Sequence, residues 1–167
     1  MRALILLALL VLAGCAAPAP RVRTVFLDAA PLHATLPNET ALPPGFHLGW
    51  EQPETRSDGT DAASRVFDYT RGNETVRHQI TVGVMRFEDD ARLEDTWRSI
   101  QQAGPTVHVR LVAPDRLQVD QVSFGGHTLQ VFGRQNGTMA WAFESAQGEE
   151  VLSDPAALVE GILQRSA

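Results

Sequence analysis

The sequence contains no lysine and a single cysteine among its 167 residues, and each scarcity excludes a class of chemistry. Without lysine, the chain can form no Schiff base and has no phosphate-binding lysine of the kind found in P-loops. One cysteine excludes an internal disulfide, a CxxC redox pair and a zinc site built on several cysteines. The formal net charge of -6 argues against nucleic acid as a partner, because backbone binding depends on clustered cations.

The N-terminus has the pattern of an export signal. Arg2 precedes an unbroken apolar run from Ala3 to Ala13, which is too short to cross roughly 30 Å of hydrocarbon and is typical of a secretory h-region. The run closes on Leu12-Ala13-Gly14-Cys15, which resembles the lipobox of prokaryotic lipoproteins. That resemblance implies a signal peptide over 1–14 and a diacylglyceryl group on Cys15. An ordinary secretory signal with a chance cysteine is the alternative.

Each asparagine of the chain begins an acceptor motif for N-glycosylation. Asn38, Asn73 and Asn136 are the only asparagines, and each is followed by a threonine two positions later. Because a lipobox combined with selected sequons suits an archaeal surface protein, we expect an archaeal source. A GC-rich bacterium with threonine-rich turns is the alternative, and the missing lysine is consistent with a GC-rich genome.

The mature chain divides into a tether and one domain. Prolines and alanines predict an extended spacer over 15–41, interrupted by an apolar island at 22–27. The island is either an edge strand or a segment docked on the domain. The remaining residues, 42–167, are about the length of a single domain.

Alternating apolar residues predict seven strands in this domain, and helical spacing predicts two helices. The strands are expected over 46–50, 65–70, 75–87, 106–113, 117–124, 127–132 and 138–145. The helices are expected from Glu88 to Ala103, with Trp97 as its anchor, and from Asp154 towards the C-terminus. The fold class is therefore α+β, an antiparallel sheet of about six or seven strands covered by two helices. This element order is similar to that of PsbP/Mog1-like domains of exported lipoproteins and, less closely, to cystatin-like sheets.

The chain lacks the common catalytic and metal-binding motifs. It contains no G-x-S-x-G elbow and no H-E-x-x-H sequence, and the acidic stretch Ser57 to Asp61 lacks the alternating ligands of a calcium loop and is interpreted as a solvated turn. We therefore expect no cofactor and no metal. His78 and His108 are the histidines placed to meet across neighbouring strands. The residues that could supply paired carboxylates gather at the start of the first helix, where capping explains them: Glu88, Asp89, Asp90, Glu94 and Asp95.

The three tryptophans could form a carbohydrate-binding surface, because flat aromatic faces stack on sugar rings. Periodicity assigns Trp97 and Trp141 to the core, together with Met139 and Phe143, and leaves Trp50 as the one candidate for exposure.

Three functions follow from these patterns. The leading hypothesis is a non-enzymatic lipoprotein on the cell surface, attached to the membrane through Cys15, that binds an envelope protein or a small ligand. The second is an extracytoplasmic hydrolase that uses the acidic helix start with His78 or His108. The third is a glycosylated structural spacer. An exposed apolar or concave face favours the first function, and a convergent polar pocket favours the second.

Overall fold

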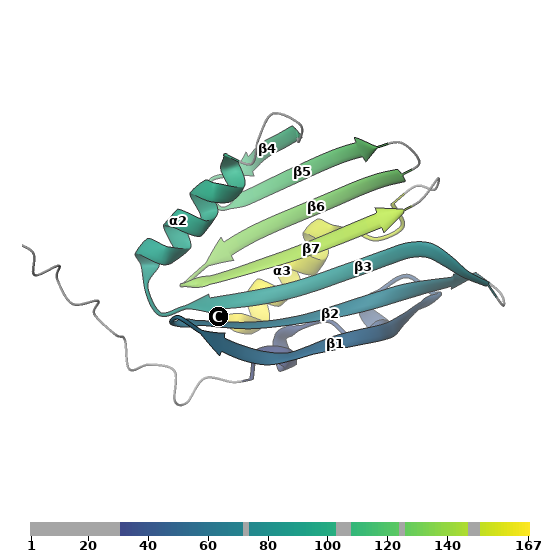
Figure 1. The fold of residues 1–167 in the computed structure, drawn as a ribbon, viewed down its shortest axis with the longest axis horizontal. Helices are drawn as coiled ribbons and strands as arrows, with labels where there is room; N and C mark the ends of the chain where they lie inside the picture. The colour runs from purple at the N-terminus through teal and green to yellow at the C-terminus, as the bar shows by residue number, and fades with distance from the viewer. Residues whose placement is uncertain (1–30, 72–73, 103–107, 124–125, 147–150) are drawn as a thin grey trace, which may run out of the picture.

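The computed structural model describes residues 31–71, 74–102, 108–123, 126–146 and 151–167. They form a seven-stranded antiparallel sheet with the strand order β1-β2-β3-β7-β6-β5-β4, which confirms the predicted α+β class (Figure 1). The strands are β1 (Phe46–Ser57), β2 (Thr60–Arg71), β3 (Glu74–Phe87), β4 (His108–Ala113), β5 (Arg116–Ser123), β6 (Gly126–Gln135) and β7 (Thr138–Ala146). The helices are η2 (Leu32–Thr35), η3 (Glu39–Ala41), α2 (Asp90–Gln101) and α3 (Pro155–Ser166).

The sheet contains one crossover connection, which joins β3 to β4 through α2. Strands β1, β2 and β3 follow one another, and α2 then carries the chain to the far edge, where β4 begins. Strands β4 to β7 return towards the middle, so that β7 pairs with β3. The two central strands are therefore distant in sequence and adjacent in the sheet.

Two tight turns fix the strand register. The β6–β7 turn at Asn136-Gly137 and the β1–β2 turn at Asp58-Gly59 both place two successive residues at positive φ, as two-residue hairpin turns of the primed type require. The strands expected over 46–50 and 65–70 are longer than predicted, because β1 continues to Ser57 and β2 begins at Thr60. The second half of β1 is polar because β1 is an edge strand and this half is exposed on both faces.

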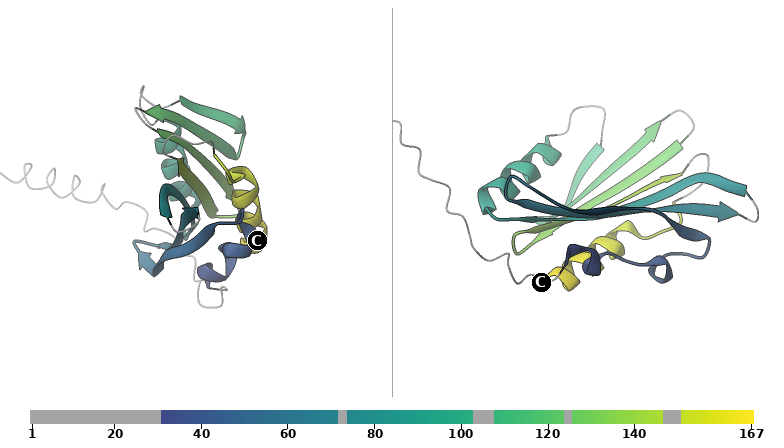
Figure 2. Two further views of the ribbon diagram at one scale, coloured as in Figure 1. Left: turned by 90° about the vertical axis from the view of Figure 1, so that its right-hand side faces the viewer. Right: turned by 60° about the horizontal axis from the view of Figure 1, so that its bottom comes forward.

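One face of the sheet carries the larger core. Helix α3 and the segment around η2 lie together on this face (Figure 2). Asp154 caps α3 by accepting hydrogen bonds from the amides of Ala156 and Ala157. The core includes residues from α3, η2 and the inward-facing positions of the strands: Leu32, Leu36, Phe46, Phe67, Ile80, Val82, Val84, Val131, Val159, Ile162 and Leu163.

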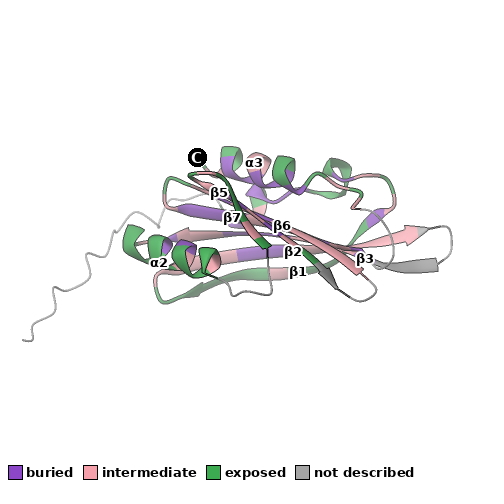
Figure 3. Ribbon diagram, turned by 90° about the horizontal axis from the view of Figure 1, so that it is seen from above, coloured by how far each residue is buried: buried purple, intermediate pink, exposed green. Residues whose placement is uncertain are grey.

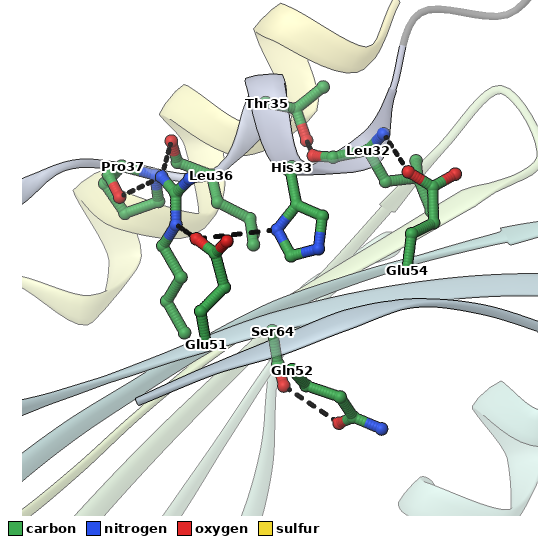
Figure 4. Close-up of polar contacts among 10 residues, drawn as sticks. Leu32, His33, Thr35, Leu36, Pro37, Glu51, Gln52, Glu54 and Ser64 are labelled. Carbon is green, nitrogen blue, oxygen red and sulfur yellow. Dashed lines mark hydrogen bonds and ion pairs between the residues drawn. The ribbon is translucent and has the colours of Figure 1, made fainter. Parts of the chain in front are cut away.

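The packed domain begins earlier than the predicted boundary at residue 42. Leu32 and Leu36 belong to the core, and polar contacts hold the surrounding backbone (Figure 4). Arg65 on β2 donates hydrogen bonds to the carbonyl oxygens of Leu36 and Pro37 at 3.2 and 3.0 Å, and Glu54 on β1 accepts one from the amide of Leu32. Residues 31–41 are therefore part of the domain. The predicted signal peptide, Cys15 and the remainder of the tether, including the island at 22–27, lie outside the described residues.

Helix α2 lies on the opposite face and covers one end of it (Figures 1 and 3). The Asp89 carboxylate caps the helix by accepting a hydrogen bond from the amide of Ala91. Trp97 is buried, as predicted, and forms a second, smaller core with Leu93, Phe87, Leu117 and Met139. Within the residues described, no helix is both long enough and apolar enough to cross a membrane.

Candidate functional site

An open groove lies beside α2 on the face opposite α3. Its volume is about 560 Å³, and its walls come from β3, β7, β6 and α2. This volume falls within the range of about 300 to 1,000 Å³ that is usual for ligand sites. The apolar part of the lining comprises Met85, Ile100, Phe132, Met139, Trp141 and Phe143.

A second hollow of about 370 Å³ continues the groove towards β5. The two hollows have four lining residues in common: Thr96, Ile100, Gln130 and Phe132. The second one adds Ser99, Val119 and Gln121. Because the two hollows share these residues, they are neighbouring parts of one depression beside α2, whose lining includes residues of β3, β7, β6 and β5. We call this depression the α2 groove.

Among the described residues, no charged side chain lines the α2 groove. Its polar members are the hydroxyls of Thr81, Thr96 and Ser99 and the amides of Gln121 and Gln130. Hydroxyl and amide groups can hydrogen-bond a neutral ligand, whereas a charged ligand would lose water without gaining a counter-ion. In the part of the chain that the structure describes, the lining also contains no histidine or carboxylate that could act as a general acid or base.

Glycine at position 83 determines how Trp141 lies in the groove. Gly83 on β3 is directly opposite Trp141 on β7, and a Cβ atom at position 83 would stand 2.0 Å from Cζ2 of the indole. The indole therefore packs directly against the β3 backbone at Gly83. A larger residue at position 83 would block this packing. Trp141 and Phe143 are half-buried groove residues, so their predicted assignment to the core was wrong, whereas Met139 is buried as expected.

The three tryptophans do not form one platform. Trp97 is buried under α2, and Trp50 is 54% exposed, as predicted. Trp50 nevertheless shares a face with the groove, because it pairs with Val66, Val66 pairs with Thr81 and Thr81 pairs with Phe143. A row of side chains, apolar except for Thr81, thus runs from the groove to the β1 edge.

A buried polar cluster lies on the other face of the same strands. Glu144 on β7 is fully buried, and its carboxylate contacts Nε2 of His78 on β3. The carboxylate accepts hydrogen bonds from the amides of Leu152 and Ser153, at 2.6 and 2.9 Å, and from the Ser153 hydroxyl. Glu144 does not stand out from the sequence alone. It lies on the buried face of β7, together with Ala140, Ala142 and Ala146.

This cluster does not form a nucleophilic triad. The carboxylate lies between Ser153 and His78, so the histidine is not placed to take the serine proton. His78 and Glu144 have no side-chain exposure, so no substrate reaches them. The contacts instead attach the segment that precedes α3 to the end of β7.

His78 and His108 do not meet. Strands β7, β6 and β5 lie between β3 and β4, so the two histidines are about 19 Å apart at the usual strand spacing. His78 is also far from the acidic helix start, which follows the end of β3 at Phe87. Nine residues separate His78 from Phe87, which corresponds to about 30 Å along the strand. The described part of the chain holds no group of three metal-ligating side chains.

Most residues of the acidic helix start have structural partners. Asp89 caps α2, and Glu88 pairs with Arg56. Glu94 pairs with Arg134 at 2.5 Å, and Arg134 also lies over the Trp97 ring, 4.8 Å from its centroid. Asp95 pairs with Arg98 on the helix surface. These contacts agree with the capping and solvation interpretation of the cluster.

Two of the three sequons can be located. Asn38 is exposed beside η3, where its side-chain oxygen accepts a hydrogen bond of 2.7 Å from the Thr40 hydroxyl. Asn136 is exposed in the β6–β7 turn. Asn73 lies outside the described residues, as does Cys15.

Comparison with known proteins assigns no family to the chain. No family model matches the sequence, and no curated protein matches it. A solved structure of a GTP-binding regulator from Thermotoga maritima is similar over 80% of this chain and 84% of its own, with a TM-score of 0.43 and 14% sequence identity. At these values, the likeness identifies neither a fold family nor an activity.

Proposed function

We propose that the protein is a lipid-anchored binding module on the cell surface and that the α2 groove is its ligand site. The observation that carries this proposal is the lining of the groove, which is predominantly apolar and entirely uncharged. Such a lining favours binding of an apolar, uncharged ligand, because binding removes the apolar surfaces of the groove and of the ligand from water. The protein binds this ligand without transforming it.

The structure offers a hydrolase no suitable site among the described residues. The acidic helix start and His78 lie at opposite ends of β3, and His108 lies on the far edge strand. The one cluster that joins histidine, carboxylate and serine is buried. A spacer, the third alternative, has no use for an open apolar groove, because exposed apolar surface favours aggregation unless a ligand or partner covers it.

The anchoring part of the proposal rests on the N-terminal sequence. Cys15 follows the apolar run and is the only cysteine, so a lipid on its thiol would attach the mature chain to the membrane. Asn38 and Asn136 are exposed and lie outside the groove lining, so glycans there would leave the ligand site open. Mass spectrometry of peptides from the native host tests modification of Asn38, Asn73 and Asn136.

Titration with N-phenylnaphthylamine, a neutral probe whose emission rises in apolar surroundings, tests the binding site. The experiment uses the full chain with Cys15→Ser, which removes the lipid. Thr96 projects from α2 into the shared part of the groove, so Thr96→Phe fills that part. Arg98→Phe adds the same ring to an exposed position on the side of α2 that faces away from the groove and serves as the matched control.

We expect saturable binding of one probe per chain, unchanged by Arg98→Phe and weakened at least tenfold by Thr96→Phe. Gly83→Ala provides a second variant, because its methyl group displaces the Trp141 indole without changing α2. Equal probe binding by the starting protein and both groove variants, each shown to be folded by circular dichroism, would overturn the proposal. Absence of probe binding to the starting protein would also overturn it.

A further inference from the structure

We infer that the α2 groove holds a single alkyl chain of a membrane lipid, an inference that rests on the proposed function. The first reason is shape. The two joined hollows cross four neighbouring strands, a span of about 14 Å at the usual strand spacing. An extended chain can contact both hollows at once, whereas a compact molecule would leave one of them unfilled.

The second reason is the distribution of polar groups along the groove. The β3–β7 end is walled by Met85, Met139 and Trp141, and Thr81 is the one hydroxyl there. Methionine side chains are flexible and polarizable, so they adapt to a mobile hydrocarbon chain. The β5 end instead presents Ser99 and Gln121. This gradient suits a ligand whose tail lies against β3 and whose neutral ester or ether linkage lies near β5.

The third reason is the absence of charge in the lining. A free fatty acid would bring its carboxylate next to side chains that offer no cation. A membrane lipid separates the chain from its headgroup by uncharged linkages, so the chain can enter while the headgroup stays in solvent. The membrane to which Cys15 would attach the protein supplies such a lipid.

A peptide strand does not suit this site. Peptides that extend a sheet bind through free backbone groups at an edge strand. The floor of the groove consists of β3, β7, β6 and β5, and each of these strands pairs with neighbours on both sides. The floor therefore presents side chains, not an unpaired ladder.

Displacement of N-phenylnaphthylamine by straight-chain alcohols tests the inference in the Cys15→Ser protein. From hexanol to dodecanol, we expect the affinity to rise by up to about fourfold per added methylene until the chain fills the groove. Cyclododecanol and dodecanoate are the matched comparisons, since one has the same carbon number in a compact ring and the other carries a charge. Both should displace the probe at least tenfold less well than dodecanol.

Vesicles of phosphatidylcholine identify the source of the chain. After incubation and re-isolation of the protein, mass spectrometry should find one lipid per chain, and Thr96→Phe should abolish its retention. Probe binding without any dependence on chain length, or equal displacement by cyclododecanol, would overturn the alkyl-chain inference and leave the proposed function standing. Displacement by alcohols with no lipid retained would overturn the membrane source. A protein that binds neither probe nor lipid would contradict both proposals.

Discussion

At the scale of single residues, Glu144 is a fully buried carboxylate with four polar contacts. Its two carboxylate oxygens face the amides of Leu152 and Ser153, the Ser153 hydroxyl and the His78 ring. Burying a carboxylate destabilises a fold unless such donors surround it. Removing the match between the carboxylate and its donors therefore lowers the free energy of unfolding. The alternation along β7 assigned Met139, Trp141 and Phe143 to the core and therefore put position 144 on the opposite, solvent face, whereas Glu144 is fully buried. It could not predict the partners, because they come from β3 and from the segment after β7.

We expect Glu144→Gln to lower the free energy of unfolding by about 1–3 kcal/mol, measured by urea denaturation. Whichever way the amide is turned, its NH₂ group faces a backbone amide that is itself a donor. Glu94→Gln, at an exposed ion pair, is the control and should cost less than about 1 kcal/mol. Equal losses in the two variants would show that the buried cluster does not hold the α3 connection.

The Glu51 carboxylate predicts a pH-dependent contribution to stability. The hydrogen bond from Arg65 holds the pKa of Glu51 below its ordinary value. A lowered pKa in the folded state stabilises the fold above the ordinary pKa of glutamate and loses this effect as the pH falls through the lowered value. Because Glu51 is largely exposed, the contribution stays within about 1 kcal/mol.

Urea denaturation of Glu51→Gln across a pH series checks this sign. The variant should be less stable than the unmodified protein at neutral pH, and the difference should shrink as the solution becomes acidic. A difference that grows on acidification would contradict the assignment.

At the scale of elements, the sequence predicted both α-helices and the approximate position of all seven strands, because alternation and capping are local signals. It did not predict which face stays open. Trp141 and Phe143 look like core residues by alternation, yet α2 has only 12 residues and covers one end of its face. The prolines similarly predicted an extended spacer over 15–41. Residues 31–41 are packed instead, because their buried leucines contact strands and a helix that are distant in sequence.

Arg65 should control the docking of this N-terminal segment. It donates to the carbonyls of Leu36 and Pro37 and to Glu51, so Arg65→Gln removes several contacts at once. We expect faster hydrogen exchange at residues 32–42, with little change in α2. Arg98→Gln, at a surface ion pair on α2, is the control. Unchanged exchange at 32–42 would show that apolar packing alone holds the segment.

At the scale of the whole molecule, the proposal joins an anchor at one end to a groove on one face. In the native host, Cys15→Ser should release the protein from membranes into the medium, because it removes the thiol that carries the proposed lipid. Fractionation followed by immunoblotting measures the release. The unmodified protein should stay with the membrane and enter detergent extracts. Retention of the Cys15→Ser protein on membranes would contradict lipidation as the attachment.

The most direct test of the account is quenching of tryptophan emission by a brominated long-chain alcohol, because bromine quenches only on contact. Trp141 lines the groove, Trp50 lies near the β1 edge and Trp97 is buried. We predict saturable quenching that persists in Trp50→Phe and falls strongly in Trp141→Phe, with a remainder from Trp97, which packs beside the groove residue Met139. Quenching that is unchanged in Trp141→Phe, or that is lost in Trp50→Phe, would place the ligand outside the α2 groove and contradict the central claim.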